Sequence, residues 1–179
     1  MRELTKDEIA ILQRHAKWLQ SDGEEGERAD LSYADLSNAK LSNSNLRNAD
    51  LSNAWLSNAR LRNSDLSNAS LRNARLRNSD LSNSDLSNSD LRYTSLRNAR
   101  LCNSDLSNAK LDFSCWPLWC GSRDVKADDR LVAQLLFHVT RLDVTQCSGG
   151  VREAMGQIRT MAVSDLFYED RNDIEKIGE

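Results

Sequence analysis

The sequence predicts a solenoid, a chain wound into regular stacked coils, and three observations lead to this fold class. From Ala29 to Phe113 the chain consists of seventeen consecutive five-residue units. Every unit holds a leucine, and a small residue (Ala, Ser or Thr) always precedes that leucine by two positions. Asn follows the leucine by two positions in fourteen of the seventeen units. The leucines, which we expect to form the core, are Leu31, Leu36, Leu41, Leu46, Leu51, Leu56, Leu61, Leu66, Leu71, Leu76, Leu81, Leu86, Leu91, Leu96, Leu101, Leu106 and Leu111.

A period of five residues fits neither regular element of secondary structure. On an α-helix, successive leucines would be displaced by about 140° and would spread around the whole surface. On a straight strand, an odd period would send alternate leucines to opposite faces. The leucines share one interior only if the backbone turns within every unit. The recurring Asn supplies that turn, because Asn tolerates positive φ better than other non-glycine residues do.

These units resemble the pentapeptide-repeat family. A unit such as 49–53, Ala-Asp-Leu-Ser-Asn, has the small–polar–Leu–x–x pattern of that family. Before the repeats, His15, Trp18 and the segment 26–31 are similar to the start of a common bacterial and phage-associated subgroup, and the segment 113–122 is similar to its end. The resemblance implies a right-handed quadrilateral β-helix, with four units per coil and with the leucine and the small residue pointing inward. Seventeen units then make about four coils.

A solenoid exposes its core and unpaired backbone groups at both ends, so we expect α-helical caps there. The pattern Thr5-x-x-Glu8 is typical of a capping box and predicts a helix to about residue 20. We expect its apolar residues to pack on the first coil through one face. The three predicted domains are an N-terminal capping helix with an acidic turn (1–28), the β-helix (29–113) and a C-terminal helical cap (114–179). The apolar face predicted for the first helix consists of Ile9, Leu12, Ala16 and Leu19.

The C-terminal region carries more apolar surface than a cap needs. After Pro117 and Gly121 we expect helices over about 126–142 and from about residue 151. Excess apolar surface favours association, so we hypothesise a homodimer formed through these helices. The residues predicted for this surface are Leu131, Leu135, Leu136, Val139, Met155 and Ile158.

Composition excludes several classes of protein. The chain has 179 residues, of which 39% are hydrophobic, and a net charge of −3. Its apolar runs fall short of the roughly 20 residues that span a bilayer, and its first residues lack the apolar core of a signal peptide. Four cysteines in such a chain indicate reduced thiols. We therefore expect a cytoplasmic protein of a bacterium.

The cysteines and histidines could in principle be assembled into a zinc site. Cys115, Cys120, Cys147 and His138 supply suitable ligand types, but the spacing of the first pair is wider than usual and the ligands fall in different elements. Buried structural thiols are the favoured interpretation, with Cys102 as an exposed thiol at an outward repeat position. We therefore predict no metal site.

The sequence shows no pattern typical of an enzyme. His15 and His138 each stand without a nucleophile or a paired carboxylate nearby in the sequence, and no glycine-rich phosphate loop is present. We expect no catalytic residue, no cofactor and no enzymatic activity. The aromatic residues expected to pin the caps to the coil are Trp18, Phe113, Trp116 and Trp119.

The outer faces of the rod carry the remaining information. Residues 29–113 include eleven basic and nine acidic residues, and reading them at a period of twenty places most of the basic ones on two adjoining faces. A third face carries a column of Asp65, Asp85 and Asp105. The candidate interaction surface consists of Lys40, Arg60, Arg62, Arg75, Arg77, Arg97 and Arg100, with Tyr33 and Tyr93.

Three functions are open at this point. The favoured one is a non-enzymatic scaffold that presents its faces to a protein partner. The resemblance also implies a second, because some pentapeptide-repeat proteins mimic DNA and bind bacterial type II topoisomerases such as gyrase. The mixed charge of this rod opposes polyanion mimicry. The third, weak nucleic-acid binding along the basic faces, is disfavoured, since a mixed charged surface also serves solubility alone.

Overall fold

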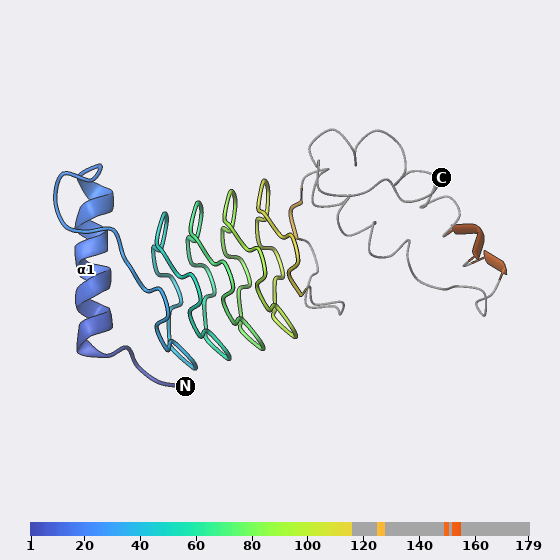
Figure 1. Ribbon diagram of the computed structural model, residues 1–179, viewed down its shortest axis with the longest axis horizontal. Coiled ribbons are helices and arrows are strands. Elements are labelled where there is room, and N and C mark those ends of the chain that lie inside the picture. The colour runs from blue at the N-terminus through green and yellow to red at the C-terminus, as the bar shows by residue number, and fades with distance from the viewer. Residues whose placement is uncertain (116–124, 128–148, 151, 155–179) are drawn as a thin grey trace. The chain divides into compact units, whose positions relative to one another are not determined.

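The structure is a computed structural model, and it describes residues 1–115, 125–127, 149–150 and 152–154. The chain divides into two compact units, Met1–Ala127 and Asp128–Glu179. Figure 1 shows the first unit as one helix, α1, beside a stack of coils. Residues 149–150 and 152–154, at the predicted start of the second C-terminal helix, are helical, but the remainder of the two predicted C-terminal helices lies outside the described residues. So do all six residues of the hypothetical dimer surface, together with Trp116, Trp119, Cys120, His138 and Cys147.

One turn of the coil takes twenty residues, which is four units. Parallel bridges join positions twenty residues apart, as in the series Asp30, Asp50, Ser70, Asp90 and Lys110. The amide N–H of Leu31, for example, donates to the carbonyl of Asp50 at 2.7 Å. In the described part of the chain these bridges are isolated and do not extend into longer strands. The repeat region is therefore a four-sided β-helix (Figure 1).

Each side ends in a turn at the residue two positions after the leucine. All seventeen of these residues have φ between 55° and 62°, the left-handed region. Asn tolerates this conformation, and Tyr33, Tyr93 and Phe113 adopt it as well. After each turn an amide bonds back to the preceding leucine carbonyl, as from Ala39 to Leu36 at 3.1 Å. The five-residue period thus reflects a turn that is repeated in every unit.

The interior is filled by the leucines and the small residues. All seventeen leucines are buried, with exposed fractions of 0 to 6%. The inward serines satisfy their hydroxyl groups within the coil: Ser84 donates to the carbonyl of Leu81 at 2.6 Å, and Ser104 donates to that of Leu101 at 2.7 Å. Buried hydroxyls that bond in this way add little cost to an apolar core.

The turn asparagines form ladders along two edges of the coil. On one edge the side-chain amide of Asn83 donates to Asn63 at 3.2 Å and its oxygen accepts from Asn103 at 3.2 Å. A second ladder links Asn58, Asn78 and Asn98. Each Asn of these two ladders therefore sets the turn and also links neighbouring coils.

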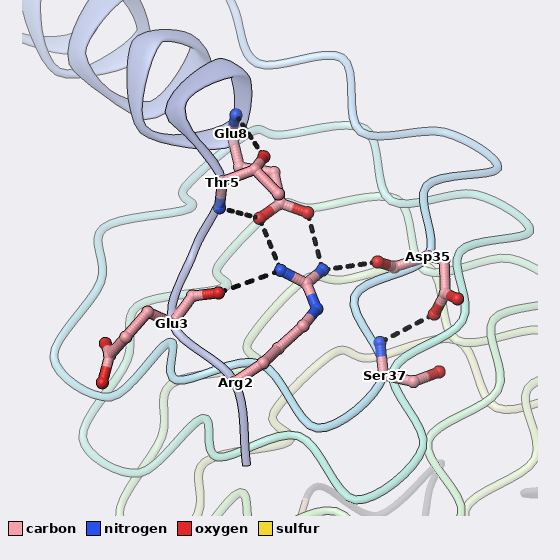
Figure 2. Close-up of polar contacts among 6 residues, drawn as sticks. All are labelled: Arg2, Glu3, Thr5, Glu8, Asp35 and Ser37. Carbon is pink, nitrogen blue, oxygen red and sulfur yellow. Dashed lines mark hydrogen bonds and ion pairs between the residues drawn. The ribbon is translucent and has the colours of Figure 1, made fainter.

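Helix α1 (Lys6–Gln20) begins at the predicted capping box. The Thr5 side chain accepts from the Glu8 amide, and the Glu8 carboxylate accepts from the Thr5 amide. Arg2 precedes the helix and extends the first coil, because it forms a parallel bridge with Ala39. Figure 2 shows its guanidinium between the Glu8 carboxylate, at 2.7 Å, and the Asp35 carbonyl.

The face that α1 turns to the coil differs from the predicted one. Ile9 is 42% exposed and Ala16 is also exposed, so the expectation for these two residues was wrong. The centre of the contact is His15, which is fully buried and accepts a hydrogen bond from the Ala29 amide at 3.1 Å. The predicted face was drawn from apolar residues only and did not include this buried polar residue. The ring of His15 stacks on Trp18 at 5.8 Å.

The turn between α1 and the coil passes very close to the helix. Gly26 has φ +76°, and a Cβ added there would lie 2.2 Å from the carbonyl oxygen of Arg14. Glycine is required at this position for both reasons, since it tolerates positive φ and has no side chain. The salt bridge between Arg14 and Glu27 lies at the same crossing, with an N–O distance of 3.0 Å.

Candidate interaction surface

The candidate surface consists of outward positions of the β-helix. In each unit the residue before the leucine and the two residues after it face outward, while the leucine and the small residue face the core. All nine residues predicted from the sequence are exposed, namely Lys40, Arg60, Arg62, Arg75, Arg77, Arg97, Arg100, Tyr33 and Tyr93. Their contacts, however, divide them into different groups.

Some of the basic residues are engaged with carboxylates. Lys40 pairs with Glu3, and Arg62 lies 3.8 Å from Asp80. By contrast, no carboxylate of the described residues pairs with Arg75, Arg77 or Arg97. These three arginines are available for an external anion.

Two arginines lie on aromatic rings. The guanidinium of Arg75 is 4.9 Å from the ring centre of Trp55, its bridge partner one coil earlier. The guanidinium of Arg72 is 5.5 Å from the ring of Tyr93. Tyr93 in turn stacks on Phe113 at 5.1 Å, with an interplanar angle of 11°. We call the set Arg72, Arg75, Arg77, Arg97, Trp55, Tyr93 and Phe113 the arginine–aromatic corner.

Sequence reasoning found only part of this corner. Trp55 and Arg72 were not among the predicted residues, and Tyr33, which is 76% exposed, has no ring contact with the corner among those that the structure describes. Phe113 was expected to pin the C-terminal cap, most of which lies outside the described residues; it is 66% exposed and stacks on Tyr93. The signal that could have revealed the corner is the twenty-residue spacing between Trp55 and Arg75.

Arg92, by contrast with the arginines of the corner, is paired with a carboxylate. Arg92 donates to Asp90 through two nitrogens, at 2.9 and 2.6 Å. This hydrogen bond from Arg92 lowers the pKa of the Asp90 carboxyl below its ordinary value. Arg92 is thus neutralised within its own unit, whereas Arg72 has no such carboxylate partner among the described residues.

The acidic column of Asp65, Asp85 and Asp105 occupies another face. Each carboxylate accepts from the amide of the serine two residues later, as from Ser87 to Asp85 at 2.8 Å. The hydrogen bond with Ser107 lowers the pKa of Asp105, and Lys126, at 3.1 Å, adds to the effect. Within the described ranges no group of three His, Cys, Asp or Glu residues is placed to hold a metal ion.

A groove runs along the edge next to Arg77 and Arg97. It has a volume of about 530 Å³. Its walls are amides and charged side chains, and among the described residues it holds no nucleophile paired with a base. The groove thus offers mainly polar binding groups, with Ala59 as the apolar residue in its lining. Its lining residues are Asn58, Ala59, Arg60, Asn78, Asp80, Asn98 and Arg100.

Both thiols in the described part of the chain differ from expectation. Cys115 was expected to be a buried structural thiol, but it is exposed. The reason is that the repeat register continues past Phe113. Cys115 forms a parallel bridge with Ser95 and so occupies the outward position that precedes the leucine in each repeat unit. Cys102 was expected to be exposed, but it is partly buried at its outward position.

The sequence was compared with models of protein families and with curated proteins. The Pentapeptide repeats family matches residues 27–48, 44–83 and 84–115, in eight copies. No curated protein matches the sequence. In the described part of the chain, no helix has the length and apolar character needed to cross a bilayer.

Solved structures with this fold are found in several organisms. A pentapeptide repeat protein of the Arabidopsis thaliana thylakoid lumen is 24% identical with a TM-score of 0.50, and the match covers 60% of this chain and 74% of that one. HetL, involved in heterocyst differentiation regulation in the cyanobacterium Nostoc, is 30% identical (TM-score 0.41; 55% and 48% covered). QnrB1, a plasmid-mediated fluoroquinolone resistance protein, is 17% identical (TM-score 0.24; 67% and 74% covered). The repeat region is a right-handed quadrilateral β-helix.

Proposed function

The chain belongs to the pentapeptide-repeat family, and we propose that it acts as a non-enzymatic interaction module whose β-helix binds a protein partner. The observation that carries this proposal is the arginine–aromatic corner. Arginine and aromatic residues dominate the binding energy of protein interfaces, and here they stand exposed on a backbone fixed by bridges to the neighbouring coils. The core, filled by leucine and small side chains, favours an outer surface as the place of binding.

We also propose that both ends of the rod are closed by helices. Helix α1 supports this for the N-terminal end, because His15 and Arg2 bond to backbone groups of the first coil. For the other end the proposal rests on the sequence of residues 114–179. Between the two caps, seventeen units correspond to about four coils.

A homodimer through the C-terminal helices remains a prediction. A monomeric mass in light scattering would contradict it.

A capture experiment tests the interaction module. The tagged full-length protein is crosslinked in a lysate of its host, in parallel with a variant carrying Arg75→Glu, Arg77→Glu and Arg97→Glu. The matched control carries Lys40→Glu, Arg60→Glu and Arg100→Glu, which changes the net charge equally on the next face. We expect a partner that the first variant loses and the control retains. Recovery of the same proteins with all three forms would show that the faces do not carry the binding.

Mimicry of DNA towards a type II topoisomerase is the second candidate function. The acidic column of Asp65, Asp85 and Asp105 favours it, because it presents three carboxylates at a spacing of about 4.8 Å per coil. The exposed arginines on two other faces oppose it. A gyrase supercoiling assay tests this function. If excess protein neither inhibits gyrase nor protects it from a quinolone, this function is excluded.

We propose a cytoplasmic location as well, from the composition and the four cysteines. Fractionation of the host with an antibody against the protein tests this. Recovery from a membrane or an extracellular fraction would contradict it.

A further inference from the structure

We propose that the partner binds the arginine–aromatic corner through an acidic segment that also carries aromatic or aliphatic side chains. This inference rests on the proposed function as an interaction module and specifies the chemistry of the partner. It follows from three properties of the corner. Its side chains come from neighbouring coils, its arginines have no carboxylate partner in the described part of the chain, and the ring of Tyr93 already contacts other side chains.

The corner is a strip that spans four consecutive coils, from Trp55 to Phe113. Arg72 and Arg75 flank the turn at Asn73, which has φ 59°. Trp55 lies one coil before Arg75, and Tyr93 lies one coil after the turn. Side chains from consecutive coils therefore meet at one edge of the rod, although they are about twenty residues apart in the sequence.

The arginines are prepared to bind carboxylates. A guanidinium that rests on an aromatic ring uses its flat face for that contact and keeps its in-plane N–H groups for hydrogen bonds, which suit a carboxylate bidentately. The guanidinium groups of Arg72 and Arg75 lie over such rings, at 5.5 and 4.9 Å from the ring centres. Neither they nor Arg77 and Arg97 pair with a carboxylate in the described part of the chain, whereas nearby Arg92 already holds Asp90.

The rings favour a protein segment over a nucleic acid. Tyr93 has Phe113 stacked on it and Arg72 over its ring, so its contacts leave little ring face for a nucleotide base. The positive strip is also short, since Asp35 is the bridge partner that precedes Trp55 in the same column. Ring edges and guanidinium groups together fit apolar and acidic side chains of a polypeptide.

The strip is also rigid before any partner arrives. The amide of Trp55 donates to the Ala34 carbonyl and that of Arg75 donates to the Ala54 carbonyl, both at 2.9 Å. These bonds fix the spacing between the coils, and the ring contacts restrict the side chains. Binding to such a surface loses less conformational entropy than binding to mobile side chains.

The test is a titration of the full-length protein, followed by fluorescence anisotropy. The probes are a labelled peptide of four Glu-Glu-Phe repeats, a Lys-Lys-Phe peptide of equal length and a thymidine oligonucleotide of twelve nucleotides. We expect the Glu-Glu-Phe peptide to bind with an affinity that falls as salt rises. Arg75→Ala, Arg72→Ala and Trp55→Ala should each weaken it by about fivefold or more.

The matched control is Arg60→Ala. Arg60 is exposed at the same outward position of its unit as Arg75, and no ring contact in the described part of the chain involves it. It should change the affinity by less than about twofold. Equal losses with Arg60→Ala and Arg75→Ala would overturn the inference in favour of unspecific charge attraction, and unchanged melting of all variants shows that they are folded.

Two further outcomes would also overturn it. Tighter binding of the oligonucleotide, with the same dependence on Arg72 and Arg75, would make the corner a nucleic-acid site. Absence of binding of the Glu-Glu-Phe peptide at about 100 µM would reject the acidic segment. The proposed function fails separately, because the crosslinking experiment can still recover a partner that uses a different face.

Discussion

In the coils every stabilising contact occurs many times, whereas at the junction between α1 and the first coil each contact occurs once. Seventeen buried leucines, and a parallel bridge at the position before each of them, together stabilise the coils. The junction depends on the hydrogen bond from Ala29 to His15, the close approach at Gly26 and the pair of Arg2 with Glu8. A repeat therefore tolerates variation of its parts, while a junction depends on particular residues.

The largest effect that we expect is in the coils, from removal of a buried leucine. Leu71→Ala should lower the free energy of unfolding by about 2–5 kcal/mol, because Leu71 is fully buried in a middle coil and leaves a cavity. Urea unfolding followed by circular dichroism measures this. The control is Arg72→Ala on the outer side of the same unit, which loses only an exposed contact with the Tyr93 ring and should cost less than about 1 kcal/mol. Similar losses for both would contradict the assignment of inside and outside.

The second largest effect that we expect is at the junction, from substitution of Gly26. Gly26→Ala forces a side chain against the Arg14 carbonyl and into a positive φ, which alone costs about 1–3 kcal/mol. We expect faster hydrogen exchange in α1, with the middle coils unchanged. Glu24→Ala in the same turn serves as the control, because Glu24 is exposed. Equal exchange rates in α1 for wild type and Gly26→Ala would contradict the close packing.

The junction should also depend on pH through His15. Burial lowers the pKa of His15 below its ordinary 6.5, the positive charge of Arg28 adds to this, and the Arg47 carbonyl opposes it. The unfolded chain therefore takes up the proton more readily, so the contribution of His15 to stability is complete above about pH 6.5 and declines as the pH falls below it. Hydrogen exchange in α1 should accelerate as the pH falls below about 6.5, after correction for the intrinsic rate. His15→Gln should remove this dependence, and an identical dependence in that variant would refute the role of His15.

The smallest effect separates the two roles of the turn asparagines. Asn83→Ala loses both ladder hydrogen bonds and places alanine at φ 58°, so we expect a loss of about 1–2 kcal/mol. Asn83→Gly loses the same hydrogen bonds but keeps the backbone conformation without strain, and it should cost less. Thermal melting compares the two. If glycine costs more than alanine, backbone conformation is not what selects Asn.

The sequence by itself determined the coil, because a leucine repeated at an odd interval can share one interior only if the chain turns in every unit. It also determined the outward positions, since they follow from the same register, and it located the capping box of Thr5 and Glu8. Only the tertiary structure decided which face α1 turns to the coil, because the central residue His15 is polar and its partner Ala29 lies fourteen residues away. Likewise, only the tertiary structure showed that the Arg75 guanidinium lies over the Trp55 ring and that Phe113 stacks on Tyr93. Contacts of this kind depend on the direction of side chains across neighbouring coils, which a residue pattern does not specify.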